Sequence, residues 1–214
     1  DICNEIGFIM ADEAIKTSAG LAKCIATYPN YKPGVIERSN YFLFNTTKET
    51  NDLVCEYGMR NSQLLTIAPT GTLSTMLGVS GGIEPIYANY YMRKTESLHG
   101  EDVYYKVYTP IVDKFMKENG LEDDSELPDY FITAQTLDYK ERIKMQAIWQ
   151  EHIDASISST VNVPNEFTVD DTIGLYTEAW KAGLKGVTIF RDGCKRLGVL
   201  STSETSNESE LGRG

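Results

Sequence analysis

The sequence predicts an α/β fold with a sheet that is at least partly parallel. Residues 160–163 have the pattern of a strand, Thr168 can cap a helix that ends at Gly183, and residues 186–190 form a further strand. Strand, helix and strand joined by short links make a βαβ unit, in which the two strands are parallel. The run 64–68 is mostly apolar without alternation, which is typical of a strand buried on both faces of a parallel sheet.

The remaining elements follow from periodicity and from stop signals. Apolar residues recur at spacings near three and four over 5–26, and a shorter helix is predicted over 48–58, where a glycine ends it. Residues 86–92 can form another strand. Thr109 followed by Pro110 predicts the start of a helix that stops at Asn119-Gly120.

A second long helix is predicted over 138–157, and it carries His152 on its apolar side. A buried histidine with satisfied hydrogen bonds is the simpler interpretation of that position, and a catalytic role is the alternative. No base partner is evident beside any cysteine, so we nominate no nucleophile.

Composition and charge exclude several classes of partner. The 214 residues contain 41% hydrophobic and 24% charged residues, which is the composition of an ordinary globular protein. The net charge of −11 argues against binding to a nucleic-acid backbone and against docking on an anionic membrane. We therefore expect no nucleic acid and no membrane as partners. A small phosphorylated ligand held by backbone amides is compatible with this charge.

The ends and the cysteines set further expectations. Residues 201–214 are rich in Ser, Thr and Glu with a single Leu, which predicts a disordered tail after an ordered part that spans 1–200. The chain opens without Met and enters a helical pattern at once, so we expect a piece of a longer protein. The cysteines (Cys3, Cys24, Cys55 and Cys194) include no C-x-x-C pair, which predicts no metal site and a reducing, cytoplasmic setting.

A turn after the strand 64–68 is the strongest candidate binding site. It comprises Pro69, Thr70, Gly71, Thr72 and Leu73. Gly71 lets a ligand approach the backbone closely, and the first amides of a following helix favour an anion. Ligands of parallel sheets gather at the carboxyl ends of the strands. The turn therefore predicts a phosphate site, although an ordinary strand-to-helix turn has the same pattern and no Walker A motif is present.

A second loop is a possible active-site loop. It comprises Gly82, Ile83, Glu84 and Pro85. Glu84 precedes a proline and should be extended, so that its carboxylate can face a site or cap a turn. Loops at strand ends carry functional residues more often than other loops do.

Three segments together resemble one enzyme family. They are 60–87 (RNSQLLTIAPTGTLSTMLGVSGGIEPIY), 152–165 (HIDASISSTVNVPN) and 183–196 (GLKGVTIFRDGCKR). They resemble the large, catalytic subunit of ribonucleotide reductase, above all the adenosylcobalamin-dependent class II enzyme. The resemblance implies the C-terminal portion of a ten-stranded α/β barrel, namely a second half-barrel with parallel βαβ units.

The resemblance also implies a function. The family reduces the 2′-hydroxyl of ribonucleotides by radical chemistry and supplies 2′-deoxyribonucleotides for DNA replication. The turn 69–73 is then expected to hold the phosphates of a ribonucleoside di- or triphosphate, with the loop 82–85 nearby. Implied partners are adenosylcobalamin with its cobalt, a dNTP effector at an upstream site, a thioredoxin-type reductant and the N-terminal half of the barrel.

The chain departs from the family pattern at its cysteines. The radical-bearing cysteine of the family lies in an Asn-x-Cys-x-Glu pattern, but Asp1 stands where Asn belongs before Cys3, so we interpret this match as coincidence. The family's reducing and shuttle cysteines have no match either. The chain alone is therefore expected to be inactive.

One position separates the classes of the family. Class I enzymes carry a Tyr-Tyr pair in the last barrel strand, and the matching residues here are Ile189 and Phe190. Neither can relay a radical as a phenol can, which favours class II. The alternatives are a class I large-subunit fragment with a diverged radical path, and a non-catalytic assembly module that completes a separately supplied half-barrel.

Overall fold

The structure is a computed structural model that describes residues 1–96 and 102–193. Within it the chain forms two compact units. The first unit comprises Asp1–Pro69, Asp138–Val161 and Thr168–Thr188, and the second comprises Thr70–Leu137, Asn162–Phe167 and the chain from Ile189 onward. The predicted tail 201–214 and Cys194 lie outside the described residues.

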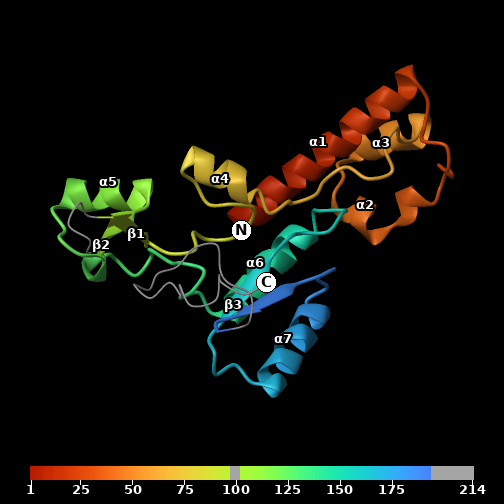
Figure 1. Cartoon of the computed structure of the whole chain (residues 1–214). Coiled ribbons are helices and arrows are strands. Elements are labelled where there is room, and N and C mark those ends of the chain that lie inside the picture. Colours follow the sequence, from red (N-terminus) through yellow and green to blue (C-terminus); the bar gives the residue numbers. More distant parts are fainter. Residues whose placement is uncertain (97–101, 194–214) are drawn as a thin grey trace, which may run out of the picture. The chain divides into compact units, whose positions relative to one another are not determined.

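Helices predominate over strands in the described residues (Figure 1). The α-helices are α1 Ile2–Cys24, α2 Asn40–Phe44, α3 Lys48–Tyr57, α4 Gly71–Leu77, α5 Pro110–Asn119, α6 Tyr139–Gln150 and α7 Val169–Lys181. Two 3-10 turns, η1 Ile36–Arg38 and η2 Asp124–Glu126, accompany them. The strands are β1 Tyr90–Glu96, β2 Asp102–Tyr108, β3 Thr160–Val163 and β4 Thr188–Arg191.

The core of the first unit lies between α1 and α3, which run side by side (Figure 1). The buried core residues are Ile15, Ala19, Phe42, Val54 and Met59. The buried Asp12 fastens the start of α3, because its carboxylate accepts the N–H of Thr47 at 2.8 Å. Thr47 in turn caps α3 by accepting the N–H of Thr50.

The predicted βαβ unit is confirmed. The N–H of Thr188 donates to the carbonyl of Ser159, and the N–H of Asp192 donates to the carbonyl of Val163. Both pairs advance in the same direction along the chain, so β3 and β4 are parallel. The connecting helix α7 begins with the predicted capping box of Thr168 and Asp171.

The run 64–68 pairs in parallel as predicted, although only a short stretch is regular. Ile67 forms a parallel bridge with Ile157, and the N–H of Ser158 donates to the carbonyl of Ile67 at 2.9 Å. The same segment continues into β3, which pairs with β4. The pairs therefore place three chain segments in parallel, as expected for part of an α/β barrel.

The predicted helix over 138–157 ends earlier than expected. α6 stops at Gln150, because the Gln150 side chain donates to the carbonyls of Ile153 and Ala155 and so stabilises a turn there. His152 lies in this turn and not on the helix.

The second unit contains an antiparallel hairpin that the sequence did not indicate. β1 pairs with β2 over the register Tyr90↔Tyr108 to Glu96↔Asp102. The strand predicted over 86–92 is therefore displaced toward the C-terminus, since the Ile86 carbonyl instead accepts the N–H of Ala134. Hairpin pairing with a later segment decides this boundary.

The helix predicted from Thr109 is confirmed as α5, with Pro110 at its start and Gly120 after its end. Thr109 is the N-cap residue, as predicted, but its side chain takes no part in the capping. Thr109 makes no capping hydrogen bond, and its buried Oγ1 has no partner among the described residues. Pro110 suits the start of the helix without a side-chain cap, because proline has no N–H and the N–H at the first helical position would have no acceptor within the helix.

Candidate functional site

The candidate turn 69–73 lies where the chain leaves the Ile67 bridge and enters α4. All five residues are exposed. The first intrahelical bond of α4 runs from the N–H of Ser74 to the carbonyl of Thr70 at 2.8 Å. The N–H groups of Gly71, Thr72 and Leu73 therefore have no acceptor within the described chain. The turn presents three backbone donors to the solvent.

The hydroxyl groups of this region have different tasks. Ser74 and Thr75 both donate to the Gly71 carbonyl at 2.9 Å, which stabilises the first turn of α4. Thr70 Oγ1 accepts a backbone N–H from the second candidate loop. Among the described residues no hydrogen bond engages the exposed Thr72 hydroxyl, so this hydroxyl is available to a ligand.

The structure brings the two predicted site segments together within the second unit. The N–H of Gly82 donates to Thr70 Oγ1 at 3.1 Å. The second loop then turns, with the N–H of Glu84 donating to the Gly81 carbonyl at 3.0 Å and φ of Gly82 at 56°. Ile83, Glu84 and Pro85 are half-buried. The family resemblance implied that the two segments lie near each other, but it did not indicate which groups join them.

The chemistry of the turn suits an anion without a salt bridge. No Lys or Arg occurs from Pro69 to Pro85, and Glu84 is the one charged residue of that stretch. Any phosphate bound here would be held by N–H dipoles and a hydroxyl group. Such donors give directional contacts at a fixed position, whereas a flexible lysine would act as a mobile point charge.

His152 is a buried histidine with both ring nitrogens engaged, as the sequence indicated. Asn45 donates through Nδ2 to the carbonyls of Tyr41 and Glu151, so its Oδ1 faces the ring and lies 2.6 Å from His152 Nδ1. Nε2 lies 2.9 Å from the side-chain oxygen of Asn4. Burial lowers the pKa of His152, and the Glu151 carboxylate opposes this effect only in part.

Asp154 is a positioning group that sequence reasoning missed. Its two carboxylate oxygens accept the N–H groups of Leu64 and Leu65 at 2.8 and 2.7 Å. Lys185 donates to the Asp154 carbonyl at 2.5 Å. These bonds fix the start of the segment 64–68 against the turn after α6. The partners are far apart in the chain, so no local sequence signal indicates them.

The described cysteines do not form a redox pair. Cys3 lies in the first turn of α1, and its Sγ is 3.8 Å from Met145 Sδ. Cys24 and Cys55 are exposed, and all three are free thiols. Among the described residues no group of His, Cys, Asp and Glu could hold a metal ion.

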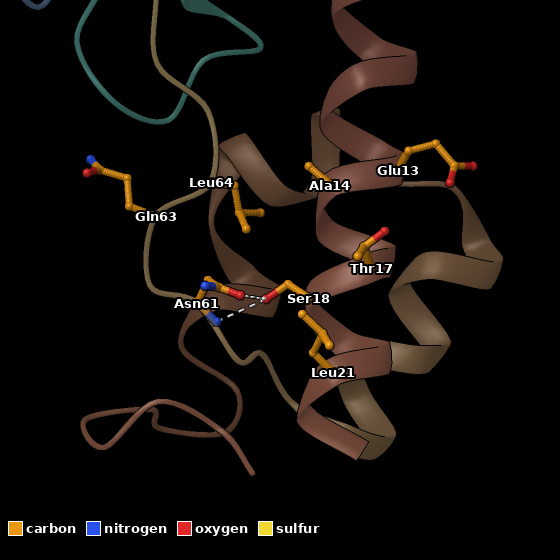
Figure 2. A pocket seen from close by; sticks show the side chains of 8 residues that line it. All are labelled: Glu13, Ala14, Thr17, Ser18, Leu21, Asn61, Gln63 and Leu64. Atoms are coloured by element: carbon orange, nitrogen blue, oxygen red, sulfur yellow. Dashed lines mark hydrogen bonds between the residues drawn. The ribbon is translucent and has the colours of Figure 1, made fainter. Parts of the chain in front are cut away.

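An open hollow of about 430 Å³ lies in the first unit, between α1 and the loop 61–64 (Figure 2). It is lined by Glu13, Ala14, Thr17, Ser18, Leu21, Asn61, Gln63 and Leu64. Ser18 Oγ donates to Asn61 Oδ1 at 3.2 Å and accepts the Asn61 N–H at 3.0 Å. The hollow contains no residue of the two candidate loops, and its one charged group is a carboxylate, which disfavours phosphate.

No helix among the described residues is long and apolar enough to cross a membrane.

The parallel pairing of Ile67 with Ile157 and of β3 with β4 is that of a portion of an α/β barrel. Residues 1–190 match the family described as "Ribonucleotide reductase, barrel domain". The match covers most of the chain, so the chain belongs to the ribonucleotide reductase barrel-domain family.

Individual relatives agree with this assignment. The chain is 33% identical over 163 residues to a vitamin B12-dependent ribonucleoside-diphosphate reductase of Mycobacterium tuberculosis (strain CDC 1551 / Oshkosh). The aligned region covers 67% of the chain and 23% of that protein. It is 31% identical over 172 residues to the protein of that name from Thermoplasma acidophilum, covering 71% of the chain and 22% of that protein. The chain thus spans less than a quarter of the length of these curated relatives.

A solved structure shows the same fold. The class Id ribonucleotide reductase alpha subunit of Actinobacillus ureae superposes with a TM-score of 0.62 at 23% identity, covering 89% of this chain and 34% of that subunit. The predicted fold, a C-terminal portion of the α/β barrel of a large subunit, is confirmed.

Proposed function

We propose that this chain supplies the substrate-phosphate turn of a ribonucleotide reductase that converts ribonucleotides to 2′-deoxyribonucleotides by radical chemistry. The observation that carries the proposal is the set of three N–H groups without acceptors, at Gly71, Thr72 and Leu73, beside the exposed Thr72 hydroxyl. These are the donors that a phosphate group needs. Family membership supports the proposal, because relatives matched over two thirds of the chain are named as reductases.

The role of the turn is to bind and orient. The phosphates of a ribonucleoside di- or triphosphate would accept the backbone N–H groups and leave the ribose free to reach reacting residues elsewhere in the complete subunit. Binding energy from such a remote group restricts the motion of the reacting part of the substrate. Because Gly71 has no side chain, the phosphate oxygens can approach its N–H closely.

The names of the relatives favour adenosylcobalamin as the source of the radical. That cofactor supplies a carbon-centred radical when its cobalt–carbon bond breaks. The described residues provide no ligand for cobalt, since both ring nitrogens of His152 are engaged and no metal-holding cluster is present among them. From the family resemblance we propose that the cofactor contacts, the catalytic cysteines, the dNTP effector site and the reductant contact lie in the remainder of the subunit.

Substitution of Gly71 tests the phosphate turn. A Cβ added at Gly71 meets no atom within 4 Å, so Gly71→Ala leaves the fold intact but places a methyl group where the phosphate would approach. In the complete subunit we expect the Kd for ADP to rise about tenfold or more, as for loss of a hydrogen bond to a charged group. Gly174→Ala in α7 is the matched control, because its Cβ also meets open space.

The outcomes are distinct. A Kd for ADP that is unchanged in Gly71→Ala and also unchanged in Thr72→Val would overturn the phosphate assignment. Nucleotide reduction by the complete subunit that depends on adenosylcobalamin would support class II. Product that instead requires a separate metal-bearing subunit would establish a class I fragment.

One observation favours assembly as a second function. α7 exposes a stripe of apolar side chains, Val169, Ile173, Tyr176 and Trp180, whose exposed fractions range from 48% to 76%. Contiguous apolar surface of this kind is typical of a protein–protein contact. We propose that it contributes to binding the N-terminal half of the barrel. Co-expression of the two halves, with Trp180→Glu as the disrupting variant, tests this: an unchanged complex contradicts a contact at α7.

A further inference from the structure

Thr70 has a backbone conformation that its residue type rarely adopts. Its φ of 48° and ψ of 29° lie in the left-handed region, where β-branched residues are outliers. The neighbouring Gly71 could have taken such a conformation without strain, yet the threonine takes it. An outlier of this kind persists only where the surroundings hold it in place. The side chain of Thr70 therefore has to be considered together with its backbone.

The Thr70 hydroxyl closes the base of a loop. The chain leaves Thr70 through α4, reverses with the N–H of Val79 donating to the Ser74 carbonyl, and returns to Thr70, where Gly82 donates its N–H to Oγ1 at 3.1 Å. Gly82 has φ of 56°, so the returning chain changes direction at this bond. All of these residues belong to the second unit.

We infer that Thr70 is a positioning residue that couples the phosphate turn to the loop 82–85. A hydroxyl that accepts the Gly82 N–H still has one proton to donate, and the open turn lies beside it. A phosphate on the N–H groups of Gly71–Leu73 would fix the Thr70 backbone, and the hydroxyl would transmit this order to Gly82, Ile83 and Glu84. This inference rests on the proposed phosphate site and assigns no contact with substrate to Glu84.

Hydrogen exchange in the complete subunit tests the coupling, with inorganic pyrophosphate as the probe. In the wild-type protein we expect pyrophosphate to slow exchange of the amides of Gly82, Ile83 and Glu84. Thr70→Val keeps the shape and the β-branch but removes the acceptor, so these amides should exchange on the order of three to ten times faster and lose the response to pyrophosphate. Thr70→Ser keeps the oxygen and should restore both properties.

Two further variants separate the hydroxyl from other effects. Thr70→Gly removes the backbone strain together with the acceptor. Exchange at Gly82 as fast as in Thr70→Val would assign the effect to the lost hydrogen bond, whereas exchange as slow as in the wild-type protein would assign the effect of Thr70→Val to its strained backbone. Thr75→Val, in the same helix, removes a hydroxyl that bonds to the Gly71 carbonyl, and it should leave exchange at Gly82 unchanged. Thr70→Gly and Thr70→Ser keep the test decisive if Thr70→Val does not fold.

The outcomes distinguish this inference from the proposed function. Pyrophosphate binding without any response at Gly82–Glu84 would overturn the coupling and leave the phosphate site standing. Unchanged exchange at Gly82 in both Thr70→Val and Thr70→Gly would overturn the hydrogen bond as the link. Failure of the wild-type subunit to bind pyrophosphate or ADP would overturn the proposed function and the coupling together.

Discussion

Substitution of Gly7 by alanine is expected to destabilise the first unit, although alanine is the better helix former. A Cβ on Gly7 would lie 2.4 Å from His152 Cδ2 and 2.7 Å from His152 Cγ. Carbon atoms in contact prefer separations of about 3.5–4.0 Å, so the methyl group would lie about 1 Å too close. The ring cannot move aside easily, because Asn45 binds its Nδ1 at 2.6 Å and Phe44 stacks on it with ring centroids 5.5 Å apart.

The expected magnitude follows from two opposing effects. Overpacking of a rigid core costs about 1–3 kcal/mol, and replacing a helical glycine by alanine contributes about 0.5–1 kcal/mol in the other direction. We therefore expect Gly7→Ala to lower the free energy of unfolding by about 1–2 kcal/mol. Gly20→Ala in the same helix is the matched control, since its Cβ meets nothing within 4 Å, and it should raise the free energy of unfolding by up to about 1 kcal/mol.

Urea unfolding followed by far-UV circular dichroism measures both variants under identical conditions. We expect the free energy of unfolding to fall in Gly7→Ala and to rise in Gly20→Ala. The double variant Gly7→Ala/His152→Ala should show a coupling energy, because removal of the ring removes the clash. Equal stabilisation by the two glycine substitutions would show that α1 does not pack on the His152 ring.

Two further predictions concern the same unit. Asp154→Ala removes the carboxylate that accepts the N–H groups of Leu64 and Leu65. It should lower the free energy of unfolding by about 3 kcal/mol, because hydrogen bonds to charged groups contribute about 1.5–3 kcal/mol each and Asp154 is only half-buried. Asp170→Ala, at an exposed position of α7, is the control, and an equal loss of stability in both variants on urea unfolding would contradict the anchoring role of Asp154. Burial lowers the pKa of His152, so the unfolded chain binds a proton on this residue more readily than the folded chain does. The stability that neutral His152 contributes is therefore present above the unfolded pKa of about 6.5 and is lost as the pH falls below that value. Urea midpoints between pH 8 and pH 5 measure this loss, and an identical pH profile in His152→Asn would assign it to other groups.

Elements with local signals were predicted well. The βαβ unit was predicted because Thr168 and Asp171 form a capping box that depends only on neighbouring residues. The end of α3 at Gly58 and the start of α5 at Pro110 have the same basis. His152 was expected to be buried and hydrogen-bonded, because it follows the apolar pattern of the preceding helix, and the structure confirms this.

Elements that depend on distant partners were not predicted. α6 ends at Gln150, and not at residue 157, because the Gln150 side chain bonds to the carbonyls that follow it. The strand expected over 86–92 became β1, since a strand begins where its partner β2 pairs with it. Short-range periodicity contains no information about either contact.

The candidate site likewise has features that the sequence indicated and features that only the folded chain shows. The residues of the turn 69–73 and of the loop 82–85 could be nominated from the sequence, because glycine, threonine and proline restrict the backbone locally. The phosphate role of the turn stays a prediction. The contact of the two segments through Thr70 and Gly82, and the anchoring of Leu64 and Leu65 by Asp154, required the folded chain. These hydrogen bonds join residues 12 and about 90 positions apart, and only tertiary packing brings such groups within bonding distance.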